Sequence, residues 1–576
     1  MSDFNPLDRA RINTHRSSFD LSSKKLFTAK VGEILPCYWQ IAIPGNTYRI
    51  SSDWFTRTVP VNTAAYTRIK EYYDFYAVPL RLISRALPQA FTQMTDYMTS
   101  AASANKNSDS LTSVPNTSLK FISDALGLSS LADTFDDVGL PFCYGACKVL
   151  DLLGYGSFIA SDNASKDAIS KSYLGFSPSS DDKNPLVYRV SQLVNLLPVF
   201  TYQKIYYDFF SNNQWEKHLA YSYNVDYWDG KSQLALSPDM FKLRYANYPK
   251  DYFMGMLPNS QYGSVAVLPS ISSSSDSRSL LYYEPNSQAT VALQSVGGSS
   301  SNVRLSKSVS SAQGIRLNSD LSALSIRATE YLQRWKEVVQ FSSKDYSDQM
   351  AAQFGIKAPE YFGNHSHYIG GWSNVININE VINTNLDAQD SQASIAGKGV
   401  SSQSGHTFTY DCGAEHQVIM CVYHAVPMLD WDVSGQAPQL TVTSITDFPQ
   451  PAFDQLGMQP VPALNLINDK SRIAEGSLGY NLRYWQWKSS IDTVHAGFRK
   501  GLAYHSWSAP LDGFDVLTSS GTFSYQSLKV RPQQLNSIFL PQVSGSNSGV
   551  SFDQLLCNVN FQVYAVQNLD RNGLPF

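Results

Sequence analysis

The longest helical pattern of the chain stands directly before one of its clearest strand patterns. Between residues 319 and 338, apolar residues recur at steps of three and four, which places them on one side of a helix. Apolar residues four apart from Tyr346 to Phe354 predict a second, shorter helix, and Gly355 suits its left-handed end. The segment VININEVI, which ends at Ile382, alternates apolar and polar residues like a half-buried strand. A helix pair is therefore expected to lead back into a sheet.

Strand-like segments stand near both ends of the chain. FTAKVGEIL, CYWQIAI and TYRIS occur early, and Pro44, Gly45 and Asn46 between the last two suit the turn of a β-hairpin. The segment of residues 68–83 contains another predicted strand, which Pro79 stops. Strands at both ends favour one antiparallel sandwich, a mainly β fold, over tandem domains. The later predicted strands are HTFTYDCGAEHQVIMCVYHAVP, LTVTSI, LRYWQWK, GTFSYQSLKV and CNVNFQVYAV.

Two long polar excursions interrupt the strand pattern. Residues of about 89–184 carry short helical patterns between Ser-, Asn- and Asp-rich loops, which predicts an insertion outside the sheet. Residues of about 270–318 are rich in Ser, and loops of this length are either functional or disordered. We expect an exposed projection here, ordered by a hairpin of LLYYEP and TVALQSV. The predicted organisation is a basic arm of residues 1–25 and a single domain of residues 26–576.

Composition changes this picture in two ways. Only 16% of the residues are charged, against roughly 25% in ordinary soluble domains, so we expect a surface that partners cover. The net charge of -4 argues against a dedicated nucleic-acid module, although a local basic patch is compatible with it.

The N-terminus MSDFNPLDRARINTHRSSFD has no apolar stretch of a secretory signal, and no run of eighteen apolar residues occurs. We therefore expect a cytosolic chain without membrane insertion.

Motifs of catalysis are weak throughout the chain. His365 and His367 form an HxH pair, but Gly371 and Trp372 stand where a metal-binding cupin would need Glu, so we expect no metal. No GxSxG, P-loop or Rossmann fingerprint occurs, and we expect no cofactor and no enzyme activity. The segment RYWQWK mixes positive charge with indole rings, as single-strand binders do, although such clusters are more often core or interface.

Several blocks resemble the major capsid protein of the microviruses, especially the gokushovirus-like branch associated with gut Bacteroidetes. INTHRSSFDLS, ILPCYWQIAIPGNTYRIS, RIKEYYDFYAVPLRLI and KDYFMGMLPNSQYG are similar to blocks of that family in the same order. PLVYRVSQLVNLLPVFTYQKIYYDFFSNNQWE and GYNLRYWQWKSSIDTVHAGFR continue the resemblance, except that His495 and Ala496 separate the Val and Gly of the last block. Together the blocks cover somewhat over half of the chain.

The resemblance implies an eight-stranded antiparallel jelly roll with large insertions. It also implies sixty copies in a T=1 icosahedral shell that encloses a circular single-stranded DNA genome. The loop of residues 270–318 would form a threefold projection that contacts a host-surface receptor. The chain would belong to the virion capsid, assembled in the bacterial cytoplasm with partners such as pilot or DNA-binding proteins. The family supplies no catalytic residue.

Three groups of candidate site residues follow from these expectations. Basic residues near the N-terminus would contact DNA through charge, without sequence readout. Residues of the projection would contact the host, and one apolar helix face would pack at the base of the projection or against a neighbouring subunit. The DNA group is Arg9, Arg11, Arg16, Lys24 and Lys25; the host group is Leu281, Tyr282, Tyr283, Ser299 and Arg304; the packing group is Tyr331, Trp335 and Val338.

Two other classes compete with the capsid hypothesis. An outer-membrane β-barrel would explain the many Tyr, Asn and Ser residues, and a secreted carbohydrate-active sandwich enzyme would explain paired acidic residues such as Asp136 and Asp137. Both classes need a signal segment, and the C-terminal DRNGLPF is turn-like where a barrel would end in a strand. Large hollow particles of the purified chain would favour the capsid over both.

Overall fold

The computed structural model of the 576-residue chain forms two compact units. The larger comprises Met1–Pro258 and Ser343–Phe576, and the smaller, Asn259–Ser342, interrupts it. The predicted division into an arm and one domain stays a prediction. The structure describes residues 15–61, 66–91, 114–156, 193–216, 238–266, 281–292, 323–356, 364–382, 395–466, 477–499, 508–509, 529–539 and 553–571, with short gaps inside several of these ranges.

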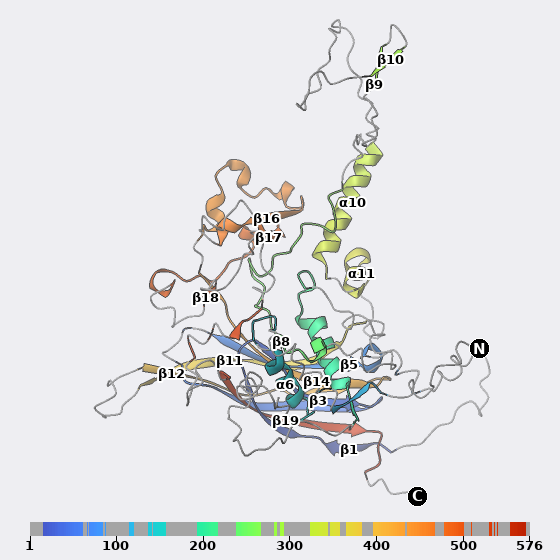
Figure 1. The fold of residues 1–576 in the computed structure, drawn as a ribbon, viewed down its shortest axis with the longest axis vertical. Coiled ribbons are helices and arrows are strands. Elements are labelled where there is room, and N and C mark those ends of the chain that lie inside the picture. Colours follow the sequence, from blue (N-terminus) through green and yellow to red (C-terminus); the bar gives the residue numbers. More distant parts are fainter. Residues whose placement is uncertain are drawn as a thin grey trace, which may run out of the picture. The chain divides into compact units, whose positions relative to one another are not determined.

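The larger unit is built on an antiparallel sheet that folds into two leaves (Figure 1). The strand order is β1-β19-β4-β12-β11-β5-β14-β3-β8, with β2 also paired to β19 and β13 also paired to β4. β11 joins the leaves, because its first part pairs with β5 and its last part with β12. We call β1, β2, β19, β4, β13 and β12 leaf 1, and β11, β5, β14, β3 and β8 leaf 2. The mainly β, antiparallel prediction is confirmed, whereas the eight-strand count stays a prediction.

The strands of the sheet have the following bounds. They are β1 (Ser17–Asp20), β2 (Ser23–Ala29), β3 (Glu33–Ala42), β4 (Thr47–Thr58), β5 (Ile69–Pro79), β8 (Arg244–Tyr245), β11 (His367–Ile382), β12 (Ile395–Ser404), β13 (Phe408–Asp411), β14 (Gln417–Pro427) and β19 (Leu555–Gln567). Short two-stranded pairs are β6 (Asn116–Ser118) with β7 (Leu193–Asn195), β15 (Asp430–Trp431) with β18 (Ser508–Ala509), and β16 (Met458–Pro462) with β17 (Ser477–Leu482).

Aromatic rings from the two leaves meet in the core of the sandwich. Tyr38 of β3 and Phe561 of β19 have ring centroids 5.3 Å apart, and Trp54 of β4 and Tyr73 of β5 have centroids 5.2 Å apart. All residues of β14 are buried, whereas β19 alternates buried and exposed positions. β14, in the middle of leaf 2, is therefore covered on both faces, whereas β19 of leaf 1 keeps one open face.

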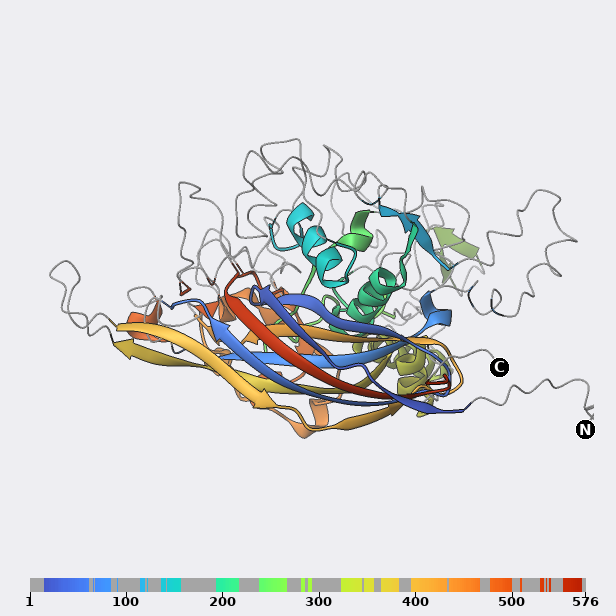
Figure 2. The same ribbon diagram turned by 90° about the horizontal axis from the view of Figure 1, so that it is seen from below.

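Helices of the larger unit cover the second face of leaf 2 (Figure 2). Helix α6 (Phe142–Leu152) packs against β3, and α8 (Leu197–Ile205), which continues as the π-helix η3 (Tyr206–Phe210), packs against β5 and β14. Short helical patterns were expected in residues of about 89–184, and α6 lies within this range, whereas α8 lies after it. The insertion itself stays a prediction.

The helix pair and the hairpin predicted around the projection are also present. α10 (Ala323–Phe341) belongs to the smaller unit, and α11 (Tyr346–Phe354) ends at Gly355, whose φ is 68°. The strand VININEVI is the last part of β11. Within the smaller unit, β9 (Leu281–Glu284) pairs with β10 (Ala289–Ala292) in antiparallel register.

Three local predictions were wrong. The turn at Pro44, Gly45 and Asn46 does not close a hairpin, because β3 pairs within leaf 2 and β4 within leaf 1, so the turn crosses from one leaf to the other. LTVTSI forms 3₁₀ turns rather than a strand, since the side chains of Ser444 and Asp447 cap a turn there. LRYWQWK leaves β17 at Leu482, and the left-handed φ of 60° at Tyr484 prevents the strand from continuing. GTFSYQSLKV lies mostly outside the described residues.

The remaining short helical segments follow the sheet edges and loops. They are α1 (Leu80–Ile83) directly after Pro79, and the 3₁₀ helices η5 (Pro238–Phe241), η7 (Pro438–Thr441), η8 (Ile445–Asp447), η9 (Pro451–Phe453), η10 (Ala463–Asn465), η11 (Trp485–Trp487) and η12 (Ala496–Arg499).

A buried ionic cluster fixes α6 to the sheet. The Lys148 ammonium lies 2.5 Å from Glu33 Oε2 of β3 and 2.9 Å from Asp553 Oδ2 beside β19. Burial alone would lower the pKa of Lys148, but the carboxylates of Asp553 and Glu33 raise it above its usual value. The cluster therefore holds a charged lysine between elements far apart in sequence, which gives the insertion one defined position.

A second buried pair lies between β5 and β14. Asp74 Oδ2 and His424 Nδ1 are 3.9 Å apart, and the His424 ring stacks on Tyr72 with centroids 4.7 Å apart. Burial raises the pKa of Asp74 from 3.8 to about 7 and lowers the pKa of His424 from 6.5 to about 3. Between these two values both side chains are neutral, so the pair is not an ion pair.

Candidate assembly and nucleic-acid surfaces

The open face of leaf 1 carries a polar groove. The groove has a volume of about 680 Å³ and crosses β2, β19, β4 and β12, with Lys24, Phe55, Ser402, Asn558 and Asn560 among its lining residues. The strand register explains the arrangement, because Asn560 stands between Lys24 and Asp53, and Asn558 between Leu26 and Phe55. Amide, hydroxyl and aromatic groups thus form rows across four strands.

Positive charges surround this groove. Arg49 and Arg57 are exposed on the same face of β4 as Phe55, and the Arg57 guanidinium lies 4.7 Å from the centre of the Phe55 ring. The acidic Asp53 accepts hydrogen bonds from Ser404 Oγ and Gln562 Nε2, at 2.5 and 2.8 Å. Its carboxylate is therefore held within the sheet, while the cations face solvent.

Sequence analysis missed Arg49, Phe55 and Arg57. The signal was present in TYRISSDWFTRT, where every second residue points away from the core. The alternation shows that these residues share a face, but it does not show which strands lie beside them. Only the pairing of β4 with β19 and β12 brings them next to Lys24 and the asparagines.

The predicted DNA-contact residues are only partly brought together. Arg16 donates hydrogen bonds to Asn568 Oδ1 at 2.9 Å and to the Gly45 carbonyl, which fastens the entry of β1 to a corner of the sandwich. Lys24 lines the groove, and Lys25 Nζ lies 3.4 Å from the Leu152 carbonyl at the end of α6. Arg9 and Arg11 lie outside the described residues.

Helix α10 exposes most of its apolar side chains. Tyr331 and Trp335, two of the three predicted packing residues, are 68% and 47% exposed, while Val338 is partly buried. Residues 259–266 of the same unit hold the helix on one side, because Lys336 Nζ donates to the Ser264 carbonyl at 2.6 Å and Tyr262 N to the Lys336 carbonyl at 3.1 Å. These contacts hold the helix, while Tyr331 and Trp335 keep much of their surface exposed.

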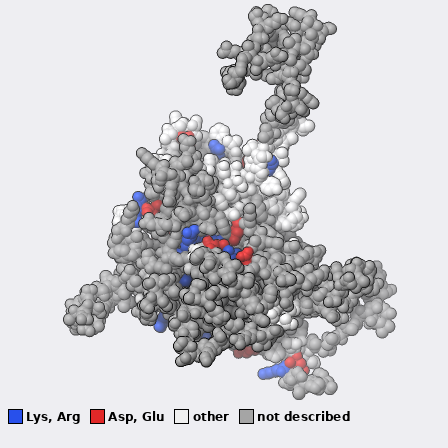
Figure 3. All heavy atoms as spheres, in the orientation of Figure 1, with Lys and Arg blue, Asp and Glu red and all other residues white. Residues whose placement is uncertain are grey.

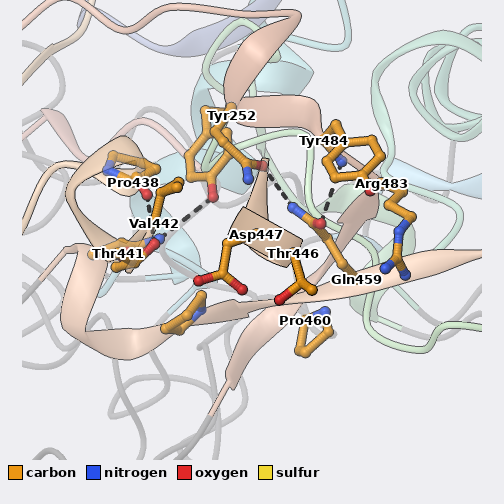
Figure 4. A pocket seen from close by; sticks show the side chains of 13 residues that line it. Tyr252, Pro438, Thr441, Val442, Thr446, Asp447, Gln459, Pro460, Arg483 and Tyr484 are labelled. Atoms are coloured by element: carbon orange, nitrogen blue, oxygen red, sulfur yellow. Dashed lines mark hydrogen bonds between the residues drawn. The ribbon is translucent and has the colours of Figure 1, made fainter. Parts of the chain in front are cut away.

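A second uncovered surface is formed by residues 436–466 and 477–489, which we call the 3₁₀ module. It contains η7 to η11 with β16 and β17, and a pocket of about 250 Å³ opens in it. In Figure 4, Arg483 and Tyr484 line one side of this pocket, and Pro438, Thr441 and Val442 line the other. Large apolar side chains are exposed next to the pocket. On the face that Figure 3 shows, the described Lys, Arg, Asp and Glu atoms gather mainly near its middle.

The predicted host-contact residues are described in part. The backbone of Leu281, Tyr282 and Tyr283 forms β9, which pairs with β10. Ser299 and Arg304 lie outside the described residues. The role of this segment in host contact stays a prediction.

In the HxH pair, the His365 ring contacts two backbone carbonyls. The two ring nitrogens of His365 lie 2.8 Å from the Ser366 carbonyl and 2.9 Å from the Asp208 carbonyl. Among the described residues, no group of three or more His, Cys, Asp or Glu could hold a metal ion. In the part of the chain that the structure describes, no helix has the length and apolar character to cross a membrane.

A β sandwich that leaves an apolar helix, an apolar loop module and a polar sheet face uncovered belongs to the class of proteins that assemble with partners. Residues 10–130 and 179–571 match the family described as capsid protein (F protein), so the chain belongs to this phage capsid protein family. Capsid protein VP1 of Chlamydia phage 1 is 24% identical over 217 residues, which are 36% of this chain and 36% of that relative. The chain is thus a structural capsid protein rather than an enzyme, as predicted, and its place is the virion capsid.

Proposed function

We propose that this chain is the major capsid protein of a T=1 shell in which sixty copies enclose a circular single-stranded DNA genome. Shell formation is supported by the family and by α10, a helix of nineteen residues whose side chains, apart from that of Gln340, are exposed or half-buried. Apolar side chains that a subunit leaves exposed are stabilised when a neighbour covers them. On this proposal Tyr331, Trp335 and Val338 pack against a neighbouring subunit, and assembly takes place in the bacterial cytoplasm.

The open face of leaf 1 is the proposed contact for the genome. Arg49, Arg57 and Lys24 supply positive charge to phosphates, and the half-buried ring of Phe55 and the exposed ring of Tyr564 offer stacking surfaces to bases. Among the described residues, the side chains of Lys24, Arg49 and Arg57 form no ion pair. Contacts of this kind do not depend on base sequence, as packaging of a whole genome requires.

The proposal is tested by expressing the chain with its genome and sizing the particles. We expect particles in the megadalton range that contain DNA. Replacing Lys24, Arg49 and Arg57 together by Gln should lower the ratio of DNA to protein severalfold, at an unchanged yield of shells. Replacing Lys250, an exposed lysine outside the groove, by Gln is the control and should change neither quantity.

The N-terminal cations are tested in the same assay. Neutralising Arg9, Arg11, Arg16, Lys24 and Lys25 should lower DNA packaging more than the yield of empty shells. Equal losses of DNA and shells would mean that these residues act in assembly. Absence of particles from the unaltered chain would refute the shell proposal itself.

A further inference from the structure

The 3₁₀ module exposes more apolar surface than a stable surface loop needs. Ile445 is 84% exposed and Leu440 is 72% exposed, and four further large apolar residues of the module are at least two-fifths exposed. Multiplying the exposed fraction of each of these residues by its full surface area gives a summed exposed area on the order of 600 Å². That area is at the upper end of the largest patches on monomers, about 300–600 Å², and near the roughly 800 Å² that each partner buries in a standard interface. The six residues are Leu440, Ile445, Phe448, Phe453, Leu456 and Trp487.

The backbone of the module is held in one conformation. The Ser444 hydroxyl accepts from Thr446 N, and the Asp447 carboxylate accepts from Ser444 N at 2.8 Å, which closes the turn that carries Ile445. Gln459 Oε1 accepts from Tyr484 N at 3.2 Å and Gln459 Nε2 donates to Gln486 Oε1 at 2.6 Å, which ties β16 to η11. The exposed side chains are therefore presented by a fixed surface, so docking costs little ordering entropy.

Polar residues line the pocket in the module. Asn465, which is 2% exposed, and Arg483 are among them. Within the described residues, the buried atoms Asn465 Oδ1 and Arg483 Nε have no hydrogen-bond partner. The Arg483 guanidinium lies 5.4 Å from the centre of the Tyr484 ring.

The pocket and the apolar residues form one surface. Leu440, Ile445 and Trp487 each directly neighbour a pocket-lining residue in the chain. The Phe448 and Trp487 rings have centroids 6.4 Å apart. Apolar side chains of the module thus lie beside this pocket.

The charge of the surface identifies the kind of partner. Residues 436–462 contain only two charged residues, Asp447 and Asp454, and the latter pairs with Lys488 at 2.5 Å. A surface with so little charge does not attract a nucleic acid, and it matches the apolar interfaces of homo-oligomers. A capsid protein meets further copies of itself on its sides, because a closed shell is built by repeating one subunit.

We propose that the 3₁₀ module is a contact surface for a second copy of this chain, an inference that rests on the proposed shell function. The exposed side chains of Ile445 and Leu440 insert into the neighbouring subunit. The module is thus a subunit contact in addition to α10.

The test compares Ile445→Glu with Ile445→Val in the full chain. Because Ile445 is 84% exposed, both variants should fold, and the thermal midpoint of the unassembled chain should be unchanged. We expect Ile445→Glu to lower the yield of particles at least tenfold in sedimentation, and Ile445→Val to assemble like the unaltered chain. A photo-cross-linking residue at position 445 should join two copies of the chain in particles.

Two results would overturn the inference. One is a particle yield of Ile445→Glu equal to that of the unaltered chain. The other is a cross-link from position 445 that joins only a different virion protein or a host protein. Failure of the unaltered chain to form particles is a different outcome, because it refutes the shell function on which the inference rests.

Discussion

Replacement of Lys148 by Met should lower the free energy of unfolding of the larger unit by about 3–5 kcal/mol, the cost of leaving a buried charge without its partner. The side chains of Lys148 and Glu33 are 2% and 0% exposed, and that of Asp553 is 9% exposed. Met has nearly the length and volume of Lys, so the cavity contribution is small. The decrease in the free energy of unfolding is therefore electrostatic in origin, because two buried carboxylates lose the ammonium group between them.

The control is an ion pair of similar length at the surface. Lys488 Nζ lies 2.5 Å from Asp454 Oδ1, but the two side chains are 40% and 44% exposed. Water screens this pair, so Lys488→Met should cost less than about 1 kcal/mol. Urea unfolding of unassembled subunits at neutral pH, followed by tryptophan fluorescence and circular dichroism, measures both variants under the same conditions.

A double variant separates lost charge from lost packing. If uncompensated charge dominates, adding Glu33→Gln to Lys148→Met removes one of the stranded carboxylates, so the double variant should be more stable than the sum of the two single losses. Equal destabilisation by Lys148→Met and Lys488→Met would refute the reasoning. Strict additivity of Lys148→Met and Glu33→Gln would also refute it, since groups in one cluster must couple.

The remaining predictions concern pH and the projection. Asp74 stabilises the fold below pH 3.8 and loses this contribution as pH rises to about 7, whereas His424 loses its contribution as pH falls from 6.5 to about 3. Stability against pH therefore changes in opposite directions for the two groups. Without the Asp74 carboxyl, the Asp74→Asn variant should lose thermal midpoint more steeply than the unaltered chain on acidification below pH 6.5. An unchanged pH profile would contradict this. Deletion of residues 272–311 with a short Gly-Ser bridge should leave the yield of shells unchanged but abolish attachment to host cells, measured by adsorption, and normal adsorption would contradict a host-contact role.

Sequence predicted those elements whose pattern is local. β19 alternates buried and exposed residues along its length, as the strict spacing of Val559, Phe561 and Val563 predicted. α11 ends at Gly355 because the left-handed φ there costs glycine little. In both cases neighbouring residues determine the structure, so no knowledge of distant contacts was needed.

Elements that depend on distant contacts were predicted less well. The Pro44–Asn46 turn has residues that suit a hairpin and a corner equally, and only the partners of β3 and β4 decide between them. LTVTSI has β-branched residues at strand spacing, but no strand lies beside it among the described residues, and local caps then favour 3₁₀ turns. Composition left a local basic patch open, but the row that sets Lys24 beside Asn560 and Asp53 arises from pairing between strands far apart in the chain.

The distribution of satisfied and unsatisfied groups implies an order of events. The ionic cluster around Lys148 and the cover of both faces of β14 are formed within one chain. Apolar side chains of α10 and of the 3₁₀ module, and the open face of leaf 1, stay exposed. On the proposed function, neighbouring subunits and DNA would cover these surfaces, and this stabilisation would grow with the concentration of the free partner. A folded subunit that assembles late is therefore expected, and the variants at Lys148 and Ile445 should fail at different steps, the first in folding and the second in assembly.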